Sequence, residues 1–222
     1  MTGQAIGEVL AFGVGVALSP LAVVAIVIML VSPGRARSAW IFGGAWPLSL
    51  GLACGLVVLL ADGADAGANG GTATWVSIVK IVLGVLLVVF GVRRWRGRER
   101  EDTPGWMRQL DGITSMRAAG LAVLFTVIKP KNLLLTIGAG VAVAQTGAGP
   151  AGQVLAVVVF ALLGSAGLLA PLAIHVLMPT RGQKLLVELR DWMVRENATV
   201  IAVLSLVIAA KLLGDALISL TG

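Results

Sequence analysis

The sequence predicts an all-α integral membrane protein with six transmembrane helices, arranged as two inverted repeats of three helices each, with the first and fourth helices broken. Three observations carry this prediction. The chain of 222 residues is 58% hydrophobic and only 13% charged, with a mean hydropathy of +0.97. Its basic residues gather in alternate connections, and a helix-breaking proline recurs in corresponding spans of the two halves. A composition this apolar is far from that of a soluble domain.

The apolar segments are long enough to cross a bilayer, since about 20 such residues span a hydrocarbon core of roughly 30 Å. The single cysteine, Cys54, excludes an internal disulfide and argues against a membrane protein that relays electrons through paired thiols. We expect the six spans at about residues 5–31, 39–60, 74–94, 114–145, 151–178 and 197–220.

The net charge of +6 comes from basic residues in every second connection. Residues 61–73 and 146–150 contain neither lysine nor arginine. Because positively charged loops stay in the cytoplasm, both termini are predicted to lie outside the plasma (inner) membrane. The basic residues then act as topology signals and contacts for membrane lipids, not as a nucleic-acid surface. They are Arg35 and Arg37, seven arginines from Arg93 to Arg117, and Arg181, Lys184, Arg190 and Arg195.

An arginine-rich connection divides the chain into a first three-helix repeat (1–92), a cytoplasmic linker (93–113) and a second repeat (114–222). An odd number of spans in each half gives the halves opposite orientations, which is the geometry of an inverted repeat. Placing Pro20 on Pro130 aligns residues 15–31 with 125–141, each a span interrupted by proline.

Each proline predicts a helix break. Proline has no N–H to donate to the carbonyl four residues back, so Pro20 frees that of Val16 and Pro130 that of Thr126. Ser19 can cap a new helix, in which Pro20 takes the first position. We therefore expect two half-helices on either side of each proline, although a simple kink is the alternative reading.

Ionisable residues within the spans are the strongest sign of function. Lys129 and Lys131 flank the second break, and residues two apart can line one site only where the helix unwinds. Four lysines lie within the predicted spans, which contain only two acidic residues, Glu8 and Asp215. Asp215 follows Lys211 by four residues and can pair with it along one helix face, and Glu8 can pair with Lys80.

The lysines beside Pro130 are thus left without an evident acidic partner. We expect Lys129 and Lys131 to hold an anionic or zwitterionic substrate group at a half-helix N-terminus, with Asn132, Ser19 and Thr126 as polar lining. Two alternatives remain: the amines extend to the cytoplasmic interface, or desolvation leaves them partly neutral.

Two cytoplasmic segments have the amphipathic spacing of helices that lie on a membrane surface. One carries Leu185, Leu186, Leu189, Trp192 and Met193 on one face, and the other carries Trp106, Met107, Leu110 and Ile113. Small-residue faces such as Gly51 and Gly55 are typical of close helix packing and raise the expectation of a homodimer. Neither a catalytic constellation nor a metal or cofactor motif occurs, so we do not expect an enzyme.

Four short motifs stand out along the chain: Leu18-Ser19-Pro20, Pro33-Gly34-Arg35-Ala36-Arg37, Phe42-Gly43-Gly44 and Ile128-Lys129-Pro130-Lys131-Asn132. Together they resemble the lysine-exporter (LysE) superfamily, and most closely its GAP branch of peptidoglycolipid-addressing, Sap-type proteins of actinobacteria. The resemblance implies inverted three-helix repeats, a central site at the broken spans, and export of metabolites or of envelope glycolipids. It places Pro20, Pro130 and Lys131 at family positions.

Two departures from the exporter pattern, at Ser19-Pro20-Leu21 and at Lys129, disfavour export of free amino acids. We therefore expect a transporter of an anionic or zwitterionic cell-envelope lipid or glycolipid precursor. One alternative is an exporter of amino acids or other small metabolites. The other is a non-transporting scaffold of a lipid-export complex.

Overall fold

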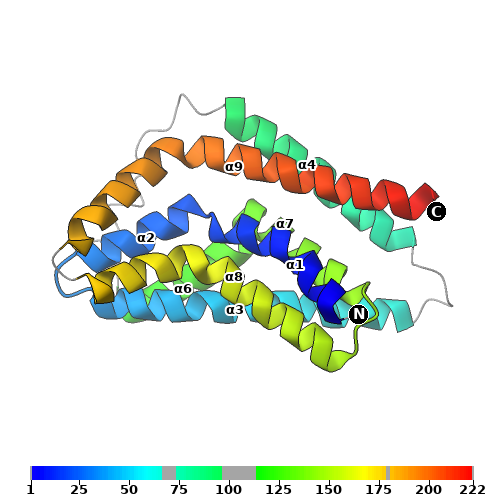
Figure 1. The fold of residues 1–222 in the computed structure, drawn as a ribbon, viewed down its shortest axis with the longest axis horizontal. Coiled ribbons are helices and arrows are strands. Elements are labelled where there is room, and N and C mark those ends of the chain that lie inside the picture. The colour runs from blue at the N-terminus through cyan, green and yellow to red at the C-terminus, as the bar shows by residue number, and fades with distance from the viewer. Residues whose placement is uncertain (1, 67–73, 97–113, 179–180, 222) are drawn as a thin grey trace.

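The computed structural model describes residues 2–66, 74–96, 114–178 and 181–221 (Figure 1). Within these ranges every regular element is an α-helix, as the sequence predicts. The helices are α1 (Thr2–Ala17), α2 (Pro20–Val31), α3 (Ala36–Ala66), α4 (Thr74–Arg96), α6 (Ser115–Val127), α7 (Pro130–Ala144), α8 (Pro150–Leu177) and α9 (Gly182–Thr221).

Two single helices of the described part are long and apolar enough to cross a membrane, α3 over Ala36–Gly63 and α8 over Pro150–Leu177. Two bent pairs, α1 with α2 and α6 with α7, raise the number of candidate spans to as many as four. The expectation of six spans in two inverted repeats, divided at residues 93–113, stays a prediction.

Both predicted helix breaks are present. The axis bends by 55° between α1 and α2 and by 67° between α6 and α7. Pro20 and Pro130 are the first residues of α2 and α7, and Ser19 and Lys129 hold the preceding N-cap positions. This is where proline fits a helix best, because its missing N–H would have no intrahelical acceptor there.

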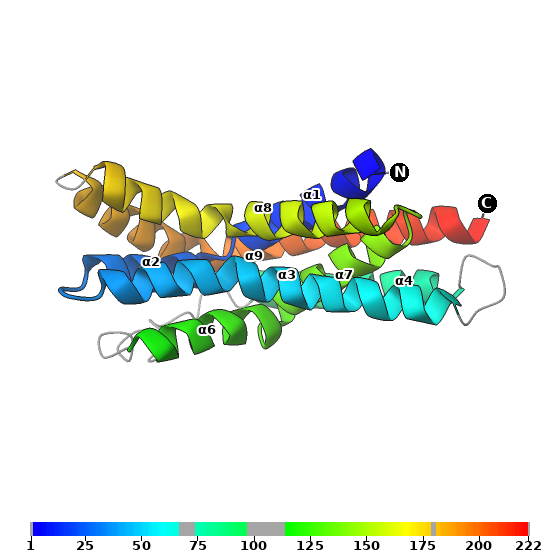
Figure 2. The ribbon, with the colours of Figure 1, turned by 90° about the horizontal axis from the view of Figure 1, so that it is seen from below.

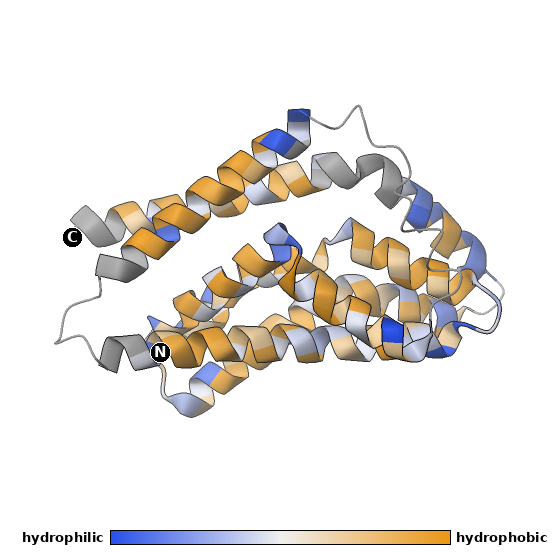
Figure 3. Ribbon diagram, turned by 180° about the vertical axis from the view of Figure 1, so that it is seen from behind, coloured by the Kyte–Doolittle hydropathy of each residue, from blue (hydrophilic) through white to orange (hydrophobic). Residues whose placement is uncertain are grey.

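The helices are hydrophobic along most of their length (Figure 3), and many of their large apolar side chains are exposed. On α3, Leu48, Leu52 and Leu59 are 67%, 76% and 71% exposed. Contiguous leucines on an outer face would be costly in water and suit contact with lipid tails. The arrangement supports a membrane protein.

The predicted boundary between a surface helix and the last span is wrong. Residues 182–221 form one continuous helix of 40 residues, α9, about 60 Å long at 1.5 Å per residue. That is roughly twice the hydrocarbon thickness, so a single crossing of a membrane by this helix would leave its amphipathic first part outside the apolar layer. In that part Leu186 is buried, whereas Leu185 and Trp192 are exposed. The other expected surface helix, near Trp106, lies outside the described residues, as does most of the 93–113 linker.

The helices pack in two groups. Helices α4 and α9 lie along each other, and this pair contacts the rest through α2 and, less extensively, through α7, α8 and α1 (Figures 1 and 2). In the rest, α1 packs on α7 and α8, and α3 on α6, α7 and α8. The N- and C-terminal ends lie at one end of the molecule, and the α2–α3 turn lies at the other.

A glycine allows α8 to approach the first break closely. A Cβ added at Gly167 of α8 would clash with the backbone carbonyl of Ala17, the last residue of α1. Any larger residue would push α1 away at the point where it ends. The position of the first break is therefore set in part by a small residue on a neighbouring helix.

Candidate functional site at the two helix breaks

The two breaks meet inside the bundle, and Lys131 joins them. Its side chain is only 5% exposed, and its ammonium donates hydrogen bonds to the carbonyl oxygens of Gly15 (2.8 Å) and Leu18 (2.9 Å) at the end of α1. A cation is favoured at a helix C-terminus, where carbonyls lack intrahelical donors. The sequence offered no acidic partner for Lys131, and the partners it has in the structure are these backbone carbonyl groups.

Asn132 makes a second connection between the breaks. It is 1% exposed; its side-chain oxygen accepts a hydrogen bond from Ser19 Oγ (2.9 Å), and its nitrogen donates to the Phe125 carbonyl (3.0 Å). Ser19 occupies the N-cap position of α2, but its hydroxyl makes no capping bond there. The predicted side-chain cap is wrong, because the hydroxyl is used by Asn132.

Thr126, the remaining expected polar lining residue, lies in the contact between α6 and α3. Its hydroxyl is 2.9 Å from that of Ser49 and donates to the Ala122 carbonyl at 3.0 Å. Ser49 in turn donates to the Trp46 carbonyl. Sequence reasoning did not identify Ser49, although a serine two residues after Pro47 in an apolar span was a usable signal. Thr126 does not line the cavity described next.

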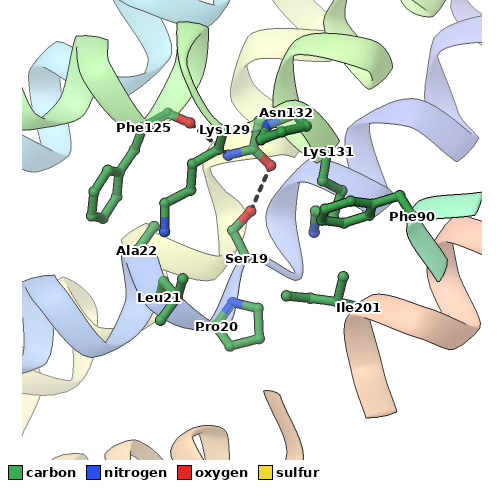
Figure 4. A pocket seen from close by; sticks show the side chains of 11 residues that line it. Ser19, Pro20, Leu21, Ala22, Phe90, Phe125, Lys129, Lys131, Asn132 and Ile201 are labelled. Atoms are coloured by element: carbon green, nitrogen blue, oxygen red, sulfur yellow. Dashed lines mark hydrogen bonds between the residues drawn. The ribbon is translucent and has the colours of Figure 1, made fainter. Parts of the chain in front are cut away.

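A cavity of about 290 Å³ lies where the breaks meet (Figure 4). It is bordered by the starts of α2 and α7 and closed on another side by Phe90 of α4 and Ile201 of α9. Four of the site residues predicted from the sequence line this cavity: Ser19, Lys129, Lys131 and Asn132. The full set is Ser19, Pro20, Leu21, Ala22, Phe90, Phe125, Lys129, Pro130, Lys131, Asn132 and Ile201.

Lys129 is the half-buried cation of this cavity. Its ammonium lies 3.9 Å from the centre of the Phe125 ring, a cation–π geometry. Phe125 is held by an edge contact with Phe42, with ring centres 6.4 Å apart. Because the first turns of α2 and α7 also border the cavity, helix dipoles add positive potential to that of the ammonium. The combined field favours a negatively charged group.

A separate charge cluster links α1 and α9. Lys211 contacts Glu8 at 2.7 Å and Asp215 at 2.8 Å, with all three side chains about one-third exposed. The predicted pairing of Lys211 with Asp215 is confirmed. The predicted pairing of Glu8 with Lys80 is wrong, because α1 presents Glu8 to α9, whereas Lys80 is on α4. Among the described residues, no group of three or more His, Cys, Asp or Glu is placed to hold a metal.

Apolar outer faces, two broken helices and a cationic cavity between them define a helical membrane protein with an internal polar site. The model of one protein family, described as Sap, sulfolipid-1-addressing protein, matches residues 9–218. The chain belongs to this family. A role in lipid addressing or export accords with that membership.

Neither the curated proteins nor the solved structures include a match to the chain. The resemblance to the wider lysine-exporter superfamily therefore stays a prediction.

Proposed function

We propose that the protein is a six-span transporter of the plasma membrane that moves an anionic cell-envelope lipid or glycolipid precursor. The observation that carries the proposal is the cavity between the two breaks, where Lys129 and two helix N-termini supply positive potential. Membership of a lipid-addressing family supports a lipid as substrate. Helices α4 and α9 are the third and sixth spans of this proposal, with both termini outside the cytoplasm.

The mechanism is alternating access around the breaks. Half-helices that meet at mid-bundle can tilt about the break without breaking intrahelical hydrogen bonds, which is how many transporters expose a central site to either side. Lys131 and Asn132 tie the start of α7 to α1 and α2. The two breaks therefore move together, so the binding of a ligand at Lys129 depends on the conformation of both breaks.

The lining favours a lipid over a free amino acid. Apart from the two lysines, Ser19 and Asn132, the cavity wall is made of apolar side chains and prolines, including Phe90, Phe125 and Ile201. An amino acid would need fixed partners for both its charged groups, and the described residues lining the cavity include no acid for an ammonium group. A lipid with one acidic headgroup matches a cation within an apolar wall.

Reconstituted vesicles test the proposal. The purified protein is placed in vesicles with a trace of phosphatidylglycerol that carries a dithionite-sensitive fluorophore on one acyl chain, and dithionite reports how fast inner-leaflet lipid reaches the outside. We expect faster exchange than in protein-free vesicles and a loss of about tenfold in Lys129→Gln, the effect of losing one charge-assisted contact. The matched control is Lys184→Gln, a lysine 85% exposed at the surface.

Each alternative function gives a different result. Protein-dependent flux of glutamate without lipid exchange would replace the lipid proposal with metabolite export. Retention of phosphatidylglycerol by the protein without any exchange would favour a scaffold. Equal exchange in the Lys129 and Lys184 variants would remove Lys129 from the site.

A further inference from the structure

A second hollow of about 310 Å³ lies beside the cavity, between α4 and the broken α6–α7 helix. We call it the α4–α7 groove. It shares Phe90 and Pro130 with the cavity, so the two spaces adjoin at these residues. Its lining consists of Leu86, Val89, Phe90, Arg93, Ile128, Pro130, Leu133 and Leu134.

The groove is apolar except at one end. Leu86, Val89, Phe90 and Arg93 follow one face of α4 at the helical spacing of three and four residues, and Arg93 is the last of them. Val89 is 48% exposed and Ile128, on the opposite wall, is 64% exposed. The groove therefore opens on the outer surface of the bundle, where a membrane protein meets lipid tails.

The volumes of the cavity and of the α4–α7 groove limit what each can hold. About 290 Å³ is at the lower limit of small-molecule pockets, enough for a polar headgroup but not for a headgroup with its acyl chains. Any lipid bound at Lys129 must therefore extend its chains out of the cavity. The adjoining α4–α7 groove is apolar, open to the side and of similar volume.

We propose that the α4–α7 groove holds an acyl chain of the anionic lipid whose headgroup occupies the cavity, and that Arg93 binds the acidic headgroup as the lipid enters from the bilayer. This inference rests on the proposed function and adds the route and a second cationic contact. Lipid tails are as apolar as the groove, so the groove adds little affinity of its own. The preference for an anionic lipid over a neutral one comes from the charges at Arg93 and Lys129.

Native mass spectrometry of the purified full chain tests this with equal amounts of phosphatidylglycerol and phosphatidylcholine in the detergent. The wild type is expected to retain phosphatidylglycerol preferentially. Arg93→Gln should lower that retention about tenfold, by loss of a charge-assisted contact. Val89→Trp should lower it by filling the groove, whereas Val158→Trp, at a site 45% exposed on α8, should not.

A lipid with a photoreactive acyl chain gives an independent measurement on the unmodified chain, should Val89→Trp fail to fold. Cross-links of photoreactive phosphatidylglycerol are expected within residues 86–93 and 128–134, reduced by unlabelled phosphatidylglycerol but not by phosphatidylcholine. Cross-links there that both lipids reduce equally would overturn the groove assignment.

Different results would overturn the groove assignment and the proposed function. If Val89→Trp and Arg93→Gln retain lipid as Val158→Trp does, while Lys129→Gln loses it, the groove assignment is overturned and the headgroup site remains. If Lys129→Gln also retains phosphatidylglycerol fully, the site of the proposed function fails, and the groove inference fails with it.

Discussion

The hydrogen bond between Ser19 and Asn132 joins the two breaks directly and can be measured by a double-mutant cycle. Ser19→Ala removes the donor, and Asn132→Leu removes the acceptor with little change in volume. Both side chains are buried, at 6% and 1% exposure, and the oxygen atoms are 2.9 Å apart. Hydrogen bonds between membrane helices contribute about 0.6 kcal/mol on average and up to about 1.7 kcal/mol.

We expect a coupling free energy of about 0.6–1.7 kcal/mol between these two substitutions. Asn132→Leu alone should be more costly than Ser19→Ala, because it also leaves the buried Phe125 carbonyl without its side-chain donor. The assay is reversible unfolding of the purified protein in mixed micelles with rising SDS, followed by circular dichroism.

The control cycle pairs Asn132→Leu with Ser165→Ala. Ser165 is equally buried, but its hydroxyl donates to the Ala161 carbonyl of its own helix, so these two changes should be additive. A Ser19–Asn132 coupling as small as that of the control pair would refute the reasoning that the breaks are tied by this bond.

Two further substitutions, each with a control substitution, test other contacts by the same unfolding assay. Lys211→Gln leaves two partly exposed acids facing each other and should cost about 1–2 kcal/mol, a value reduced for solvent screening. Lys184→Gln, which removes one member of an exposed ion pair, should change the free energy of unfolding by less than about 0.5 kcal/mol. Equal losses in the two lysine variants would contradict a stabilising role of the Lys211 charge cluster. Gly167→Ala should cost about 1–3 kcal/mol because its Cβ meets the backbone of Ala17. Gly120→Ala, with open space around it, should be neutral or stabilising by up to about 1 kcal/mol. Similar losses of stability in the two glycine variants would exclude a clash between residue 167 and Ala17.

The sequence predicts features that depend on local chemistry. Pro20 and Pro130 mark the breaks because a missing N–H and a fixed φ act on the same turn of helix. Lys211 and Asp215 pair because four residues separate them along one helix face. Both predictions are confirmed by the structure.

Contacts between distant segments could not be predicted in the same way. The partners of Lys131 are backbone carbonyls, which every residue carries, so no side-chain pattern marks them. The sequence suggests Lys80 as the partner of Glu8, and only the packing of α1 near α9 brings Glu8 to Lys211 instead. The continuity of α9 was missed because a change from amphipathic to apolar composition does not by itself end a helix.

We propose that a negatively charged headgroup binds at Lys129, where the two helix breaks meet. A cryo-EM map of the protein in nanodiscs containing phosphatidylglycerol tests it most directly. We expect headgroup density in the cavity within hydrogen-bonding distance of Lys129 Nζ, with the lipid tail leaving toward α4. A well-resolved cavity without lipid density, at saturating phosphatidylglycerol, would contradict the claim.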